Sequence, residues 1–362
     1  MTDNTPIHNM RIDEVADQWA SQHEDAGQLD LALDTCLIRV RSNSKPLIEE
    51  LREYFSPFVV MTEQPTIVIT AIETEPPTIN ADLTIKEPDP GKTKIKEEFI
   101  NITDGRIVRK RLTGMVFAFG ADTNLAIGPC LANANQVVNF VNNRYIEWRL
   151  HRESMLFHAA AVAYQCKGVA ISGFSGKGKS TLSLHMMSRG CDFVSNDRLM
   201  VARDGDQLSM YGVPKLPRIN PGTIVNNPDL STMLSTEEID AFNDMDPATL
   251  WNLEQKYDVD LERCYGVGRQ LLSHPMHTLV ILNWTRDNTP TEVHRVNLRE
   301  RSDLMPAFMK SVGLFFRYDG SGTMPSEDPA DYVALLESCK VLEVRGGVDF
   351  EHAADACLAH PD

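Results

Sequence analysis

Eight consecutive residues constrain the fold of this chain more than any other part of the sequence. Residues 173–180 read G-F-S-G-K-G-K-S and match the pattern G-x-x-x-x-G-K-[ST] of a phosphate-binding loop. In such a loop, glycines let backbone N–H groups surround phosphate oxygens at the start of a helix. The pattern of apolar residues predicts a strand over 169–171 and a helix over 181–187. Strand, loop and helix therefore occur in the order that nucleotide binding requires.

Two side chains of this loop have a specific chemical role. The Lys179 ammonium is expected to reach the β- and γ-phosphates of a nucleotide, and the Ser180 hydroxyl is expected to bind Mg²⁺. The other expected nucleotide contacts come from Gly173, Ser175, Gly176, Lys177, Gly178 and Thr181. A glycine-rich turn without a ligand is the alternative, and we favour the phosphate-binding loop because every part occurs in the required order.

An acidic residue follows the next apolar segment. Residues 191–194 predict a strand that ends in Ser-Asn-Asp, which places Asp197 at a strand end close to the loop. A magnesium-associated or catalytic acid occupies such a position in phosphoryl-transfer proteins. A turn cap is the alternative for Asp197. His158, which precedes the loop, would by itself be interpreted as a buried structural histidine.

Composition narrows the classes of function. With 35 Lys and Arg against 51 Asp and Glu, the formal charge is 35 − 51 = −16, so the chain lacks the overall basic character of a nucleic-acid-binding protein. No apolar run approaches the roughly 18 residues of a membrane span, and the N-terminus lacks the features of a signal peptide. We therefore expect a cytoplasmic protein without a membrane partner. The 7 cysteines are scattered and predict neither a disulfide framework nor a zinc site.

The length of 362 residues favours about two domains. We expect a polar tail or short helix over 1–28, an N-terminal α/β domain over 29–150 and a domain with the phosphate-binding loop over 151–362. The elements expected in the first domain are a strand over 31–40, a helix over 44–55, a strand over 65–72, a loop over 87–91 and a helix over 133–150.

The region around the loop combines three features of one known family. In that family a histidine precedes the loop by the interval that separates His158 from Gly173, and the loop has the form G-x-S-G-x-G-K-S. The family's next helix ends in Arg-Gly before a strand that finishes in two acids and Arg, which this chain matches with Arg189-Gly190 and V-S-N-D-R. Residues 155–200 thus resemble the HPr kinase/phosphorylases, and more closely the HPr-kinase-related kinases. The resemblance implies an α/β fold with a C-terminal P-loop kinase domain, of the HPr kinase and phosphoenolpyruvate carboxykinase type, after a smaller N-terminal α/β domain.

The resemblance also implies roles for individual residues. Lys179 would bind phosphate, Ser180 and Asp197 would lie at the Mg²⁺, and Asp197 would accept the proton of the hydroxyl that attacks the γ-phosphate. His158 would be an active-site residue. Asn196 stands where the family has the first of its two acids, and the family's magnesium-binding glutamate has no clear counterpart. These departures leave the family's reverse reaction, phosphorolysis of a phosphoserine, without its expected carboxylates.

Two basic residues of a later segment are further candidates. In kinases distantly related to this family, basic residues near this position meet phosphates, so Lys215 and Arg218 are candidates to neutralise γ-phosphate charge. Solvent-exposed loop charge is an equally good interpretation of both.

The function implied is an ATP- and Mg²⁺-dependent kinase that transfers the γ-phosphoryl group to a Ser or Thr hydroxyl of a small protein partner. Two alternatives stay open: a kinase of a small-molecule hydroxyl such as free serine or a sugar, and a nucleotide-binding module without catalysis. Hexamers occur in the resembled family, so a homo-oligomer is compatible with the resemblance.

Overall fold

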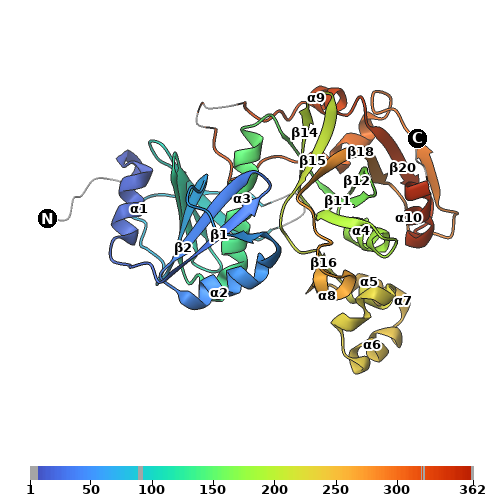
Figure 1. Cartoon of the computed structure of the whole chain (residues 1–362), viewed down its shortest axis with the longest axis horizontal. Coiled ribbons are helices and arrows are strands. Elements are labelled where there is room, and N and C mark those ends of the chain that lie inside the picture. The colour runs from blue at the N-terminus through green and yellow to red at the C-terminus, as the bar shows by residue number, and fades with distance from the viewer. Residues whose placement is uncertain (1–6, 89–92, 319, 321–322, 360–362) are drawn as a thin grey trace. The chain divides into compact units, whose positions relative to one another are not determined.

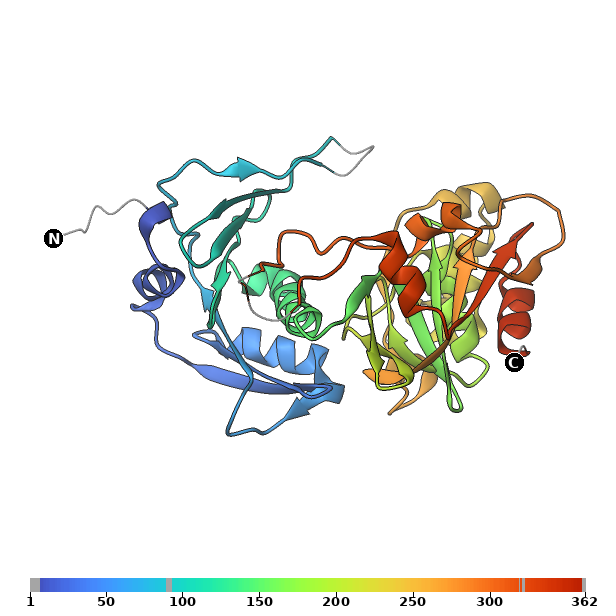
Figure 2. The ribbon, with the colours of Figure 1, turned by 90° about the horizontal axis from the view of Figure 1, so that it is seen from above.

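The chain forms two compact units, each of mixed α/β structure (Figures 1 and 2). The computed structural model describes residues 7–88, 93–318, 320 and 323–359, so parts of the predicted segments 1–28 and 87–91 lie outside the described residues. The first unit is Met1–Trp148 with Val312–Gly322, and the second is Arg149–Ser311 with Thr323–Asp362. The chain therefore leaves the second unit at residue 311 and returns to it at residue 323.

The first unit is built on one mixed sheet with the strand order β3-β1-β2-β4-β9-β8-β7-β6-β5. Its strands are β1 (Gly27–Leu33), β2 (Cys36–Ser42), β3 (Val59–Val60), β4 (Ile67–Glu73), β5 (Thr84–Ile85), β6 (Glu97–Asn101), β7 (Arg106–Lys110), β8 (Val116–Gly120) and β9 (Thr123–Gly128). Its helices are α1 (Ile12–Ala20), α2 (Lys45–Tyr54) and α3 (Ala134–Leu150), the last of which continues into the second unit. Buried Ile12 and Val15 pack α1 onto apolar side chains of β4, β7, β8 and β9.

The predicted strand over 31–40 is wrong, because this segment contains a tight hairpin. β1 and β2 pair antiparallel, and Asp34 and Thr35 form the turn between them. Asp34 has φ 56°, a left-handed conformation that Asp tolerates better than most residues. The turn interrupts a run of alternating apolar residues, which made the two strands look like one. The helix over 44–55, the strand over 65–72 and the helix over 133–150 are confirmed as α2, β4 and α3.

The sheet of the second unit positions the phosphate-binding loop. Its strands run in the order β10-β14-β15-β18-β12-β11-β13, with β20 beside β18 and β19 beside β20. They are β10 (Met155–Phe157), β11 (Ala159–Tyr164), β12 (Lys167–Gly173), β13 (Asp192–Ser195), β14 (Leu199–Asp204), β15 (Gln207–Gly212), β18 (Ser273–Leu282), β19 (Glu292–Arg295) and β20 (Lys340–Arg345). β12, β18 and β20 are parallel, so their carboxyl ends lie at one edge of the sheet, with Gly173 opposite Leu282 and Leu282 opposite Val344. Ligand sites of α/β sheets commonly lie at such an edge.

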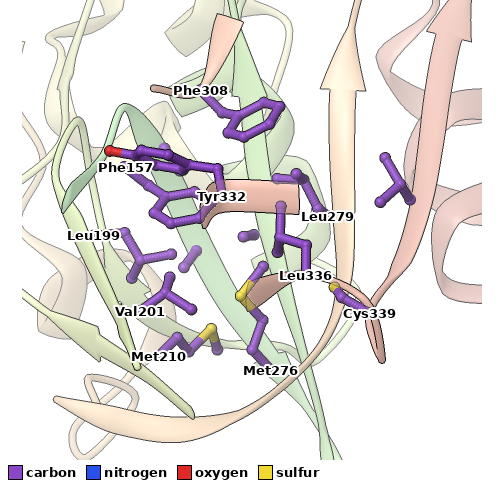
Figure 3. Packing of buried hydrophobic residues seen from close by; sticks show 14 of the residues in the cluster. Phe157, Leu199, Val201, Met210, Met276, Leu279, Phe308, Tyr332, Leu336 and Cys339 are labelled. Carbon is purple, nitrogen blue, oxygen red and sulfur yellow. The ribbon is translucent and has the colours of Figure 1, made fainter. Parts of the chain in front are cut away.

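Helices cover both faces of this sheet. Along β11, alternate residues join two separate apolar clusters: Ala159, Ala161 and Ala163 face one, and Ala160 and Val162 face the other. The first cluster contains residues of η5 (Ser302–Ala307) and α9 (Pro329–Leu335), and part of it is drawn in Figure 3. The second contains residues of α4 (Lys179–Met187) and α10 (Phe350–Ala359). The predicted strand over 169–171 and helix over 181–187 are confirmed by β12 and α4.

Short elements between β15 and β18 complete the second unit (Figure 1). They are β16 (Arg218–Ile219), α5 (Pro221–Val225), η4 (Pro228–Met233), α6 (Thr236–Asn243), α7 (Pro247–Asn252), β17 (Tyr257–Asp258) and α8 (Leu261–Tyr265). Across both units, none of the helices that the structure describes has the length and apolar character needed to cross a bilayer.

Candidate functional site

The loop after β12 has the backbone that its glycines permit. Gly176 (φ 79°) and Gly178 (φ 87°) are left-handed, and α4 begins directly after Gly178. A Cβ on Gly178 would lie 2.6 Å from the Phe350 ring, so this position excludes a side chain on steric as well as conformational grounds. The Lys179 ammonium donates a hydrogen bond to the Gly173 carbonyl at 3.0 Å. The Lys179 side chain therefore folds back over the loop to Gly173, the residue at which the loop begins.

A reciprocal pair of hydrogen bonds fixes the loop to the end of the sheet. The Lys177 ammonium donates to the Trp284 carbonyl at 2.7 Å, and the buried Trp284 indole N–H donates to the Lys177 carbonyl at 2.9 Å. The Lys177 side chain is thus used to hold the loop onto the residues that follow β18.

The end of β13 brings two polar side chains, Asn196 and Asp197, into the same cavity as the loop. The Ser180 hydroxyl donates a hydrogen bond to Asn196 Oδ1 at 2.6 Å. His158 Nε2 lies 3.2 Å from Asp197 Oδ1. Asp197 itself has φ 69°, a left-handed conformation that Asp tolerates better than most residues. The sequence predicts Asp197 at a strand end close to the loop, and Asp197 follows β13 by two residues and lines the same cavity as Ser180.

Electrostatics favour an ionised Asp197. Burial opposes its ionisation, but the hydrogen bond from His158 and the charges of Lys310, His158 and Lys215 outweigh burial and hold the pKa of Asp197 well below its usual range. Burial, with a smaller contribution from the charge of Lys310 and against the opposing effect of Asp197, lowers the pKa of Lys179 to about 8. Burial also lowers the pKa of Lys215, and the charge of neighbouring cations, chiefly Arg198, adds to this effect. Cations therefore outnumber the carboxylate here, which suits a site for an anionic ligand.

One cavity of about 1120 Å³ in the second unit gathers most of the predicted site residues. Its lining includes His158, Ser175, Gly176, Gly178, Lys179, Ser180, Thr181, Asp197, Lys215 and Arg218. Gly173 and Lys177 were also predicted to contact the nucleotide, but they are not part of the lining. Arg218 forms an ion pair with Asp258 at 3.1 Å, between two exposed side chains. The positive charge of Lys215 instead favours the ionised form of Asp197.

Sequence reasoning missed several residues of this region. Trp251, Arg286 and Phe350 line the cavity, and the Arg286 guanidinium lies 4.3 Å from the centroid of the Trp251 ring. Lys310 was missed as well. All four lie far along the chain from the loop, in segments that carry no motif, so no local pattern could have indicated them.

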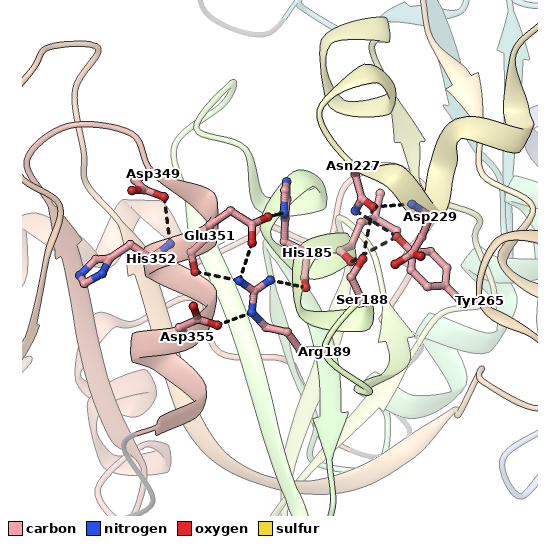
Figure 4. A network of polar contacts seen from close by, with 11 residues as sticks. His185, Ser188, Arg189, Asn227, Asp229, Tyr265, Asp349, Glu351, His352 and Asp355 are labelled. Atoms are coloured by element: carbon pink, nitrogen blue, oxygen red, sulfur yellow. Dashed lines mark hydrogen bonds and ion pairs between the residues drawn. The ribbon is translucent and has the colours of Figure 1, made fainter. Parts of the chain in front are cut away.

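The far end of α4 is held by a polar network (Figure 4). His185 Nδ1 lies 2.6 Å from Glu351 Oε1, and Arg189 forms ion pairs with Glu351 at 2.7 Å and Asp355 at 2.5 Å. Burial lowers the pKa of His185 against the opposing effect of Glu351. The His185 ring stacks on Phe350, with centroids 5.5 Å apart. Through Phe350, which abuts Gly178, this network ties α10 to the loop.

The residues present fit a magnesium ion in the presence of phosphates. Ser180, Asn196 and Asp197 offer hydroxyl, amide and carboxylate oxygens close together. In the described part of the chain there is no group of three or more His, Cys, Asp or Glu side chains that could hold a metal by itself. Mg²⁺ typically uses one or two protein ligands together with substrate phosphates and water, so a sparse oxygen set is suitable.

Comparison with known proteins gives little support for a particular family or function. The sequence matches no protein-family model and no curated protein. Among solved structures, the HPr(Ser) kinase/phosphatase from Coxiella burnetii matches with a TM-score of 0.29 and 13% identity, over 57% of this chain and 90% of that chain. A similarity of this size does not establish a common fold, so the assignment of a function rests on the residues of this chain.

Proposed function

We propose that this chain is an ATP- and Mg²⁺-dependent kinase that transfers the γ-phosphoryl group to a Ser or Thr hydroxyl of a small protein partner. The observation that carries the proposal is the meeting, in one cavity, of Lys179 and Ser180 with the pair formed by His158 and Asp197. The first two residues suit a nucleotide triphosphate, and the second pair suits an acceptor hydroxyl.

At the phosphate end, the backbone N–H groups at the start of α4 and the Lys179 ammonium would bind the β- and γ-phosphates. In the structure Lys179 bonds to Gly173 O, and phosphate oxygens would replace this neutral acceptor. Lys215 adds a second cation near Asp197. Mg²⁺, held by Ser180 and Asp197 with Asn196 beside them, would neutralise charge on the phosphates when bound.

At the acceptor end, Asp197 would accept a hydrogen bond from the attacking hydroxyl and orient its oxygen toward the γ-phosphorus. His158 fixes the carboxylate through the 3.2 Å contact. A carboxylate with a low pKa is a weak base, but phosphoryl transfer passes through a loose transition state, in which orientation of the nucleophile matters more than early proton removal. The proton of the hydroxyl passes to Asp197 as the new P–O bond forms and the bond to the ADP leaving group breaks.

A protein acceptor is proposed from the resemblance of residues 155–200 to HPr kinases. The test is incubation of the purified chain and Mg²⁺ with ATP labelled in the γ-phosphate, together with small proteins, free serine and sugars as separate acceptors. We expect label on Ser or Thr of a small protein, and its loss in Lys179→Met and Asp197→Asn. Lys340→Met and Asp204→Asn, outside the cavity lining, are the matched controls.

Other outcomes would select another function. Label on serine or a sugar, with none on protein, would make the chain a small-molecule kinase. ATP binding that survives Asp197→Asn, with no transfer to any acceptor by the wild type, would make it a nucleotide-binding module.

A further inference from the structure

A short segment far along the chain runs beside His158. The Phe308 carbonyl accepts a hydrogen bond from the His158 N–H at 2.7 Å, and Met309 forms a β-bridge with Phe157. The Phe308 ring stacks on Phe157 with centroids 5.6 Å apart, and Tyr332 packs against both rings (Figure 3). Core packing and strand-like pairing thus fix the backbone that leads directly into Lys310.

Lys310 brings a positive charge to the Asp197 end of the cavity. Its ammonium favours the ionised form of Asp197 and disfavours the charged forms of Lys179 and Lys215. Three ammonium groups thus act on one carboxylate. Mutual repulsion of like charges destabilises this arrangement, and a bound polyanion would relieve the repulsion.

Two residues after Lys310 the chain enters Val312–Gly322, which belongs to the first unit. There the Phe315 ring packs against Phe117, Phe119 and Phe140. Arg106 donates hydrogen bonds to the carbonyls of Leu314 and Phe316, at 2.7 and 3.2 Å. The backbone before Lys310 is therefore fixed within the second unit by the hydrogen bond and ring packing of Phe308, and the chain after it belongs to the first unit.

We propose that Lys310 supplies positive charge to the terminal phosphoryl group of the bound nucleotide. This role rests on the proposed function. Lys310 interacts with Asp197, which would face the acceptor hydroxyl, and with Lys179, which would bridge the β- and γ-phosphates. The γ-phosphoryl group would lie between these two side chains, whereas the α-phosphate and the base would not. Lys310 is not part of the cavity lining, so it acts through its charge at short range.

The test compares binding of two nucleotides that differ only at the terminal phosphoryl position. Affinities for Mg-ADP and for Mg-bound adenylyl imidodiphosphate are measured by calorimetry in wild type, Lys310→Met, Lys310→Arg and the control Lys340→Met. We expect Lys310→Met to weaken binding of the triphosphate analogue about fivefold, as loss of one nearby charge implies, while ADP affinity stays within about twofold. Lys310→Arg should restore the affinity because the charge returns, and circular dichroism should show that each variant is folded.

The two proposals fail in different ways. If the wild type binds the triphosphate analogue, and Lys310→Met changes neither affinity or lowers both equally, the role of Lys310 is overturned while the proposed function stands. If Lys310→Arg fails to restore affinity, charge is not the property that matters, and the role is again overturned. If the wild type binds neither nucleotide, the proposed function is overturned together with the role that rests on it.

Discussion

The Ser180 hydroxyl donates a hydrogen bond to the Asn196 side-chain oxygen, with 2.6 Å between the two oxygens. This contact joins the first turn of α4 to the residue that follows β13. Asn196 is buried and neutral, so the oxygens available to a metal at this point carry the charge of Asp197 alone.

Replacing this amide by a carboxylate should strengthen metal binding. Asn196→Asp is expected to lower the Mg²⁺ concentration that half-saturates ATP binding about fivefold, because an added negative charge attracts the cation more strongly than an amide oxygen. The measurement is a Mg²⁺ titration followed by calorimetry. Asn288→Asp adds the same charge at an exposed position outside the cavity lining and should leave the titration unchanged. An unchanged titration in Asn196→Asp as well would mean that residue 196 does not face the metal.

Nucleotide binding in the absence of metal should depend on pH through Lys179. Burial lowers the pKa of Lys179 to about 8, so its phosphate-binding ammonium form predominates below pH 8 and is lost above it. With EDTA present, ATP affinity should fall about tenfold between pH 7 and pH 9, since only about a tenth of the side chain stays charged at pH 9. Lys179→Arg keeps its charge and should show a much flatter profile over this range. The prediction fails if both proteins lose affinity equally.

Two glycines with a left-handed backbone, Gly178 and Gly190, allow the steric effect of an added side chain to be measured apart from its conformational strain. Gly190→Ala should lower the free energy of unfolding by about 1 kcal/mol, because φ is 92° there but a Cβ would meet no atom within 4 Å. Gly178→Ala adds a collision with Phe350 to a similar strain and should lower it by about 2–4 kcal/mol. Urea denaturation measures both. Gly178→Ala combined with Phe350→Leu should recover part of the difference, and equal effects of the two single variants would contradict the structure.

Lys177 should matter for stability more than for the ligand. Its ammonium bonds to the Trp284 carbonyl, so Lys177→Met should lower the free energy of unfolding by about 1–3 kcal/mol. ATP affinity should stay within about twofold, whereas Lys179→Met should lower it more than tenfold. A large loss of affinity in Lys177→Met, with stability unchanged, would instead support the contact with phosphate that its place in the loop predicts.

A feature of the fold or the site could be predicted from the sequence where its residues are contiguous in the chain. β12, the loop and α4 are contiguous, so their order, the glycines and the Lys179–Ser180 pair are readable from one stretch of chain. His158 lies just before β11 and Asp197 just after β13, and these strands are antiparallel neighbours. The family spacing indicates His158 as an active-site residue, but its contact with Asp197 depends on this pairing and is not predicted from the sequence.

The features that sequence reasoning missed depend on tertiary contacts. Lys310 acquires its significance from pairing of the segment before it with β10, and no periodicity marks that pairing. The hairpin of β1 and β2 was misread because Asp34 supplies the turn without a glycine or proline beside it. Lys177 can be recognised as an anchor of the loop only once the chain after β18 is known to pass beside the loop.

Residues 312–317 also determine when the first unit can be completed during synthesis. The Phe315 ring fills a space among Phe117, Phe119 and Phe140, and the Phe315 carbonyl accepts a hydrogen bond from the buried Arg144. A ribosome makes these residues only after it has made 149–311. The N-terminal part of the chain therefore emerges first but lacks the contacts of Phe315 until most of the second unit has been translated, and a fragment ending near residue 150 would lack them altogether.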